Sequence, residues 1–75
     1  MARIEVESQV TGRVWKIVTE TGTRVSEGDT LLILESMKME IPVESPFNGT
    51  VLKILLNEGD SVNEDQVVAI VDKTT

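Results

Sequence analysis

The sequence predicts an all-β fold, a flattened β-barrel or sandwich of two four-stranded antiparallel sheets related by a pseudo-twofold axis. Two observations predict it. Eight short segments rich in Val, Ile and Leu are separated by turn residues, and these segments fall into two equivalent sets of four. The sets form an ungapped repeat, in which residues 4–35 align with residues 41–72 at an offset of 37 (41 − 4). A repeat this regular indicates two copies of one supersecondary unit.

The first copy should contain four strands. They are expected at residues 4–7, at 12–19, around Val25 and at 30–35. Gly22 and Gly28 mark the turns between them. The last strand is rich in good helix formers, but its counterpart in the second copy is β-branched and short. Because both copies should share one backbone, we expect a strand there and not a helix.

The second copy repeats this order. Its strands are expected at 39–44, at 49–56, around Val62 and at 66–72. Asp65 stands where the first copy has Gly28, which Asp tolerates because it visits left-handed backbone conformations more readily than most residues. Pro42 cannot donate a ladder hydrogen bond, so we expect an edge strand or a bulge at that position.

One spacing departs from simple alternation. Val14 and Ile17 are three residues apart, whereas the side chains of a strand change face at every residue. Val51 and Ile54 repeat this spacing in the second copy. A β-bulge that shifts the phase is the expected explanation, and a strand covered on both faces is the alternative.

Composition limits the function classes. A chain of 75 residues and 8.3 kDa is one small domain, residues 1–75, and its 40% apolar and 27% charged residues are typical of a globular protein. There is no cysteine, no run of about 18 apolar residues and no apolar N-terminal stretch, so we expect a cytoplasmic protein with no membrane association. The net charge of −6 argues against nucleic acid as a partner.

Catalysis by the chain itself is not expected. Without His, Cys or Tyr, the usual nucleophile and base pairs are missing. Most of the thirteen acidic residues fall in turns or on strand surfaces. The chemistry therefore rests on Lys38, which lies in the connection between the two copies, where residues 36–40 have no counterpart in the repeat.

The turn that holds Lys38 is unusual. Two-residue hairpin turns favour Asn-Gly or Asp-Gly because both central residues need positive φ, yet residues 36–40 contain neither Gly nor Asn. Holding Met37 and Lys38 in such a turn should cost roughly 1 kcal/mol or more per strained residue. Met37 and Met39 could fill one end of the core or be recognised by a partner, and the residues alone leave both readings open.

The stretch Glu35-Ser36-Met37-Lys38-Met39 resembles the Glu-Ala-Met-Lys-Met motif of biotinyl domains, the biotin carboxyl carrier family. The similarity extends over essentially the whole chain. Ser36 replaces the commoner alanine, which is similar to the short stand-alone biotin/lipoyl attachment proteins. Gln9 stands where many members have proline, and the chain has no insertion like the "thumb" of some bacterial carriers.

The resemblance implies a function. Biotin would be joined by an amide to the Lys38 side chain by a biotin protein ligase, and would carry carboxyl between biotin carboxylase and carboxyltransferase sites. Met37 and Met39 would be recognised by the ligase and the carboxyltransferase, with Glu35 and Ser36 flanking the motif. We expect a monomer in isolation. The alternatives are a lipoyl carrier of a 2-oxoacid dehydrogenase-type complex and an unmodified β-sandwich interaction module.

Overall fold

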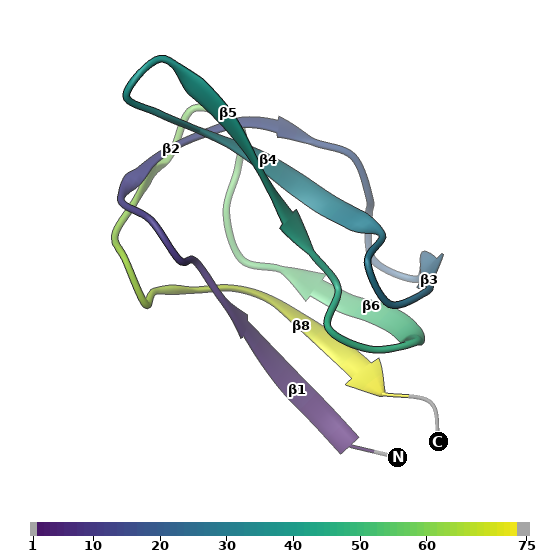
Figure 1. The fold of residues 1–75 in the computed structure, drawn as a ribbon. Helices are drawn as coiled ribbons and strands as arrows, with labels where there is room; N and C mark the ends of the chain where they lie inside the picture. The colour runs from purple at the N-terminus through teal and green to yellow at the C-terminus, as the bar shows by residue number, and fades with distance from the viewer. Residues whose placement is uncertain (1, 74–75) are drawn as a thin grey trace.

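The computed structural model describes residues 2–73 as two four-stranded antiparallel sheets, which confirms the expected fold class (Figure 1). The strands are β1 (Ala2–Glu7), β2 (Gly12–Ile17), β3 (Arg24–Val25), β4 (Thr30–Ser36), β5 (Met39–Glu44), β6 (Gly49–Ile54), β7 (Ser61–Val62) and β8 (Val67–Lys73). Thr30–Ser36 is a strand, as the repeat indicates. Within residues 2–73, no helix could span a membrane.

Each sheet draws strands from both copies. One has the order β1-β8-β6-β3 and the other has the order β5-β4-β2-β7. The first copy therefore gives β1 and β3 to one sheet and β2 and β4 to the other, and the second copy does the reverse. Neither copy can complete a sheet alone, so the two halves stabilise each other.

Six strand boundaries differ by one or two residues from expectation. β1 begins two residues early, at Ala2, and β4 and β8 each end one residue late, at Ser36 and Lys73. β2 and β6 each end two residues early, at Ile17 and Ile54, because only one backbone hydrogen bond continues each pairing. In these bonds Val18 N donates to Leu31 O at 3.2 Å, and Leu55 N donates to Val68 O at 3.0 Å. β8 begins one residue later than expected because Gln66 N donates to Asn63 O within a turn, at 3.0 Å.

The expected bulge is present in both copies. The pairing of β2 with β4 shifts register between Val14 and Lys16, and that of β6 with β8 shifts between Val51 and Lys53. Val14 and Val51 stay buried on the inner face. The bulge therefore places Trp15 in an exposed position, where 48% of its surface is accessible.

Pro42 lies in an edge strand, as expected. Pro42 belongs to β5, the outer strand of its sheet, and pairs with Ile33 of β4. Its counterpart Glu5 belongs to β1, the outer strand of the other sheet, and pairs with Ile70 of β8. Proline is tolerated because an edge strand leaves one side of its backbone unpaired.

The core lies between the two sheets and is almost entirely aliphatic. Its buried hydrophobic residues are Val6, Val14, Val25, Leu31, Leu32, Leu34, Val43, Val51, Val62, Val68, Ala69 and Val71. The two buried hydroxyls are satisfied locally. Ser8 Oγ donates to Val10 O and Ser45 Oγ donates to Phe47 O, each at 2.6 Å.

Candidate functional site

The β4–β5 hairpin ends in a two-residue turn. Its strands remain paired up to Ser36 and Met39, which leaves only Met37 and Lys38 in the loop. Their φ angles are 52° and 65°, so both adopt the left-handed conformation that the sequence predicts. Asp65 has a φ of 70°, close to the 91° of Gly28, which confirms the substitution inferred from the repeat.

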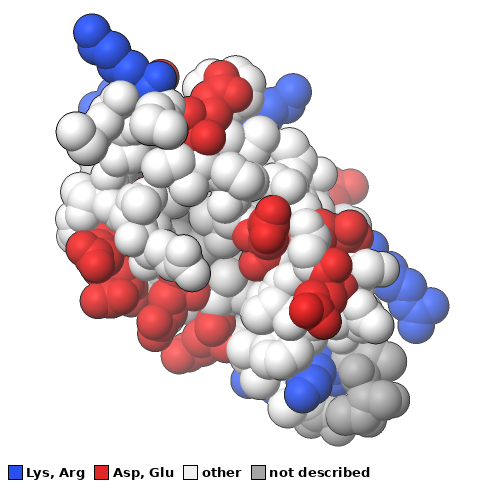
Figure 2. All heavy atoms as spheres, viewed as in Figure 1, with Lys and Arg blue, Asp and Glu red and all other residues white. Residues whose placement is uncertain are grey.

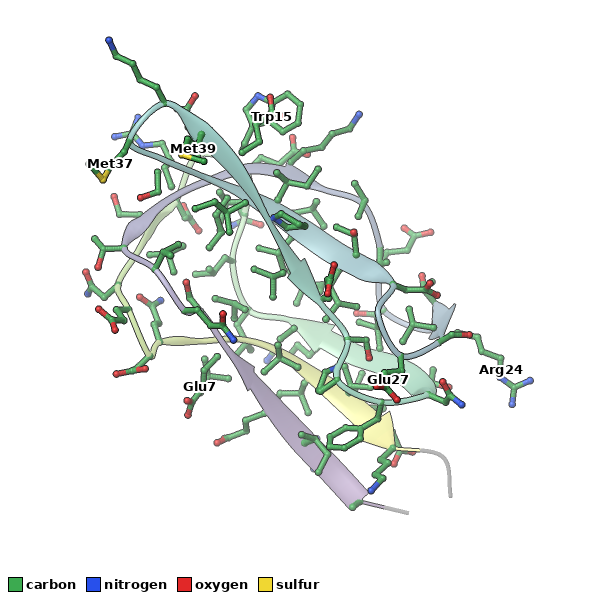
Figure 3. The ribbon with its side chains drawn as sticks, in the orientation of Figure 1. Glu7, Trp15, Arg24, Glu27, Met37 and Met39 are labelled. Carbon is green, nitrogen blue, oxygen red and sulfur yellow. The ribbon has the colours of Figure 1, made fainter. Side chains whose placement is uncertain are left out.

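The side chains at this tip face solvent. Met37 is 91% exposed, Met39 is 63% exposed and Lys38 is exposed. The two methionines therefore do not fill the core, and the reading in which they plug one end of the sandwich is wrong. Figure 3 places both of them at the end of the molecule formed by the β4–β5 hairpin.

The base of the hairpin is held by neighbouring strands. Ser36 Oγ donates a 2.8 Å hydrogen bond to Thr11 O, immediately before β2. A Cβ at Gly12 would collide with the carbonyl oxygen of Glu35 and approach Ser36 Cβ to 3.2 Å, so only glycine allows β2 to come this close. Leu34, two residues before Ser36 on β4, is fully buried. A flexible lysine stem thus stands on a rigid base.

The tip lies far from the chain ends. The molecule is elongated, with extents of 36 × 19 × 18 Å. Ala2 and Lys73 are paired at the end opposite the Lys38 hairpin (Figure 1). The repeat accounts for this arrangement, because the offset of 37 relates the Ala2–Lys73 pair to the Met39–Ser36 pair at the base of the turn (2 + 37 and 73 − 37).

The structure brings all five motif residues together on the hairpin, and it adds the contacts that Thr11 and Gly12 make at its base. Thr11 and Gly12 support the hairpin through backbone positions, which leave no chemical signal in a sequence. Trp15 also lies near this end of the molecule (Figure 3). Its only sequence signal is that the equivalent residue of the second copy is the smaller Leu52.

A concave region lies away from the hairpin. An open groove of about 700 Å³ runs between the edge strands β1 and β5. Its acidic lining residues are Glu5, Glu7, Glu27, Glu44 and Asp65, and acidic side chains are prominent on the face seen in Figure 2. Ser8 and Ser45 also line it, but their hydroxyls are engaged by backbone carbonyls. Among the described residues that line the groove, no nucleophile lies beside a base.

No metal centre is formed by the residues described. Within residues 2–73, no group of three or more potential metal ligands from His, Cys, Asp and Glu comes together. The chemistry available at the hairpin is therefore that of one accessible primary amine, flanked by two exposed thioethers.

Comparison with protein families gives a match over most of the chain. The model of the biotin/lipoyl family, described as "Biotin-requiring enzyme", matches residues 4–71. A biotinylated protein TB7.3 homolog from Mycolicibacterium smegmatis is 47% identical over 38 residues, which are 51% of this chain and 54% of the relative. A biotin/lipoyl attachment protein from Bacillus subtilis is 46% identical over 37 residues, 49% of this chain and 51% of the relative. The matched segments thus span about half the length of these relatives.

Solved structures share the fold. The urea carboxylase of Kluyveromyces lactis matches with a TM-score of 0.91 and 38% identity, over 96% of this chain and 6% of that enzyme. A single-chain, multi-domain long-chain acyl-CoA carboxylase matches with a TM-score of 0.88 over 96% of this chain and 7% of that enzyme. At 24% identity, the second match shows the fold alone. This chain is therefore similar to a small part of each large carboxylase.

The strain of the hairpin turn can be measured. Replacing Met37→Asn together with Lys38→Gly installs the residues that a positive-φ turn favours. At roughly 1 kcal/mol for each relieved residue, the melting temperature should rise by about 8–16 °C for a domain of this size. Differential scanning calorimetry measures the change. An unchanged or lower melting temperature would show that the wild-type turn is not strained.

Proposed function

The chain belongs to the biotin/lipoyl family of biotin-requiring enzymes, and on that premise we propose that it is a biotin carboxyl carrier modified on Lys38. The observation that carries the proposal is the position of Lys38, exposed in a two-residue turn at one end of a rigid sandwich. The names of the biotinylated relatives and the urea carboxylase match support it. The single domain would occupy residues 1–75.

Attachment would use the Lys38 amine as a nucleophile. A free lysine side chain is protonated at neutral pH, so a biotin protein ligase must first remove a proton from the Lys38 ammonium group. The neutral amine then attacks the carbonyl carbon of an activated biotin acyl-adenylate. The new amide replaces the bond to AMP, which leaves. The amine loses its positive charge, and the formal net charge of the chain goes from −6 to −7 (−6 − 1).

The residues around Lys38 would position it. Ser36 and Gly12 hold the hairpin against β2, so the side chain is the main flexible part of the tip. Met37 and Met39 are exposed, polarisable and adaptable, which suits contacts with a ligase and a carboxyltransferase in turn. Glu35 and Ser36 flank the modified residue. Met37 and Met39 are thus proposed as recognition residues.

Bound biotin would supply the carboxyl-transfer chemistry, and the protein would supply the tether and the docking surfaces. We place biotin carboxylase and carboxyltransferase domains among the partners, and the cytoplasm as the location. The chain itself would be non-catalytic and monomeric in isolation. Tethering makes each delivery effectively intramolecular, so weak docking to each partner is sufficient.

A lipoyl carrier is the second candidate, because one relative is named a biotin/lipoyl attachment protein. Co-expression with a biotin protein ligase, and separately with a lipoyl ligase, distinguishes the two by intact mass. We expect a biotin adduct on Lys38, located by peptide mapping, and no lipoyl adduct. A lipoyl adduct alone would favour the second candidate. An unmodified chain in both experiments would contradict any carrier function.

A further inference from the structure

The sulfur atoms of this protein are concentrated around Lys38. The chain has no cysteine and three methionines. Met37 and Met39 lie on either side of Lys38, and Met1 lies outside the described residues. The buried hydrophobic residues among positions 2–73 are all valine, leucine or alanine. An oxidant that attacks thioethers therefore acts at the Lys38 turn and leaves the described core intact.

The two methionine side chains are open to small reagents in the folded state. Met37 is 91% exposed and Met39 is 63% exposed. Met37 occupies the two-residue turn, and Met39 is paired with Ser36 at the start of β5. Figure 3 shows both side chains at the end of the hairpin. A reagent can therefore reach them without any unfolding of the sandwich.

The internal repeat indicates that the fold does not need these methionines. The counterpart of Met39 is Ala2 (39 − 37), which pairs with Lys73 as Met39 pairs with Ser36. Met37 belongs to the five residues that have no counterpart in the repeat. A chemical change at the two sulfur atoms should therefore alter the surface around Lys38 and leave the stability of the domain unchanged.

We propose that Met37 and Met39 form a reversible oxidation site, at which a hydroperoxide converts the thioethers to sulfoxides and thereby blocks modification of Lys38. The effect on modification rests on the proposed function, in which a biotin protein ligase recognises both side chains. Oxidation of the two sulfur atoms does not depend on that function and can be measured separately.

Each oxidation is a two-electron step. The lone pair of the thioether sulfur attacks one oxygen of the hydroperoxide, so that the S–O bond forms while the O–O bond breaks. The other oxygen leaves with the bonding electrons and takes up a proton, which gives water when the oxidant is hydrogen peroxide. A methionine sulfoxide reductase reverses the change, because its thiols supply two electrons and the sulfoxide oxygen leaves as water.

A sulfoxide changes the surface that the ligase meets. The thioether is soft and nearly apolar, whereas the S=O group is polar and accepts hydrogen bonds. A surface that packs against the thioethers would remove water from the sulfoxide oxygen without offering it a donor, which is unfavourable. A ligase has to close on the Lys38 amine and therefore meets the residues on both sides of it. Oxidation should raise the KM of the ligase for this chain.

Treating the unmodified chain with hydrogen peroxide tests the proposal. Oxidation has to precede biotinylation because biotin contains a thioether of its own. Each sulfoxide should add about 16 Da, and peptide mapping should locate it on Met37 and Met39. The kcat/KM of the ligase for the oxidised chain should fall at least fivefold, mainly through KM, while the melting temperature changes by less than about 2 °C. Methionine sulfoxide reductases of both stereospecificities should return kcat/KM to within twofold of the untreated value.

The double variant Met37→Leu/Met39→Leu is the matched control. Leucine keeps an apolar side chain of similar volume but has no sulfur to oxidise. Because both positions belong to the proposed recognition surface, the untreated variant serves as its own reference. Peroxide treatment should leave its kcat/KM within twofold of that reference.

Three results would overturn the oxidation site. They are the absence of sulfoxide at both residues, an unchanged kcat/KM when both are oxidised, and an equal loss in the double leucine variant, which would place the damage elsewhere in the chain. The proposed function fails separately, if the untreated wild-type chain acquires no biotin. The sulfoxides would then still form on Met37 and Met39, so the two failures can be distinguished.

Discussion

Replacing Lys38 by arginine should abolish biotin attachment completely while leaving the fold unchanged. Arginine keeps the charge and the long stem, but its guanidinium stays protonated and cannot act as the attacking amine. Position 38 lies in an exposed turn with φ of 65°, which arginine and lysine should tolerate equally. The melting temperature should therefore change by less than about 2 °C. Intact mass after co-expression with the ligase, together with a streptavidin shift assay, measures the loss.

Lys53→Arg is the matched control for this experiment. Lys53 is also exposed, and it lies on the other sheet in β6. This variant should be biotinylated at the wild-type rate. A Lys38→Arg chain that still acquires biotin would remove Lys38 as the attachment site, and a loss of biotin in both variants would point to a general folding defect instead.

Much of the fold is encoded locally enough to be predicted from the sequence. The repeat predicts the number and order of the strands, because identical spacing of apolar and turn residues implies the same backbone twice. The bulges at Trp15 and Leu52 follow from a three-residue spacing of inward side chains. Pro42 on an edge strand follows from its missing N–H.

What the sequence does not predict is how the copies share the sheets. Each sheet contains two strands from each half, and that exchange depends on contacts between residues far apart in the chain. The strand ends at Ile17 and Ile54 also depend on tertiary pairing, since the apolar run continues beyond them.

The candidate site divides in the same manner. Lys38 and its neighbours are identified by their motif, and the positive φ angles of Met37 and Lys38 follow from the length of the turn. The exposure of Met37 and Met39 could not be decided, because methionine is equally suited to a core and to a contact surface. The structure resolves this point by placing both in solvent.

Support for the hairpin base was also hidden in the sequence. Gly12 has no unusual φ, and its role comes from the close approach of the Glu35 carbonyl. Gly49 makes the equivalent approach to the Asp72 carbonyl, at the opposite end of the molecule. The repeat shows that both positions are glycine, but only the close pairing of β2 with β4 and of β6 with β8 gives the reason.

These two glycines allow stability and function to be separated. Gly12→Ala and Gly49→Ala each force a Cβ into a backbone carbonyl, so neighbouring strands must move apart. We expect each to lower the free energy of unfolding by about 2–3 kcal/mol, the cost typical of overpacking. In a domain of this size, that corresponds to a fall in melting temperature of roughly 10–20 °C. Thermal and urea unfolding measure both variants.

Only one of the two variants should impair modification. Gly12 lies beneath Glu35 and Ser36, so its Cβ disturbs the strand that carries Lys38 and the Ser36–Thr11 hydrogen bond. Gly49 lies beneath Asp72, at the end where Ala2 pairs with Lys73. Well below both melting temperatures, the rate of biotinylation should fall at least fivefold in Gly12→Ala and stay within twofold of wild type in Gly49→Ala. Equal rates in both would mean that the ligase does not depend on a rigid hairpin base, and that the motif at the tip is sufficient for recognition.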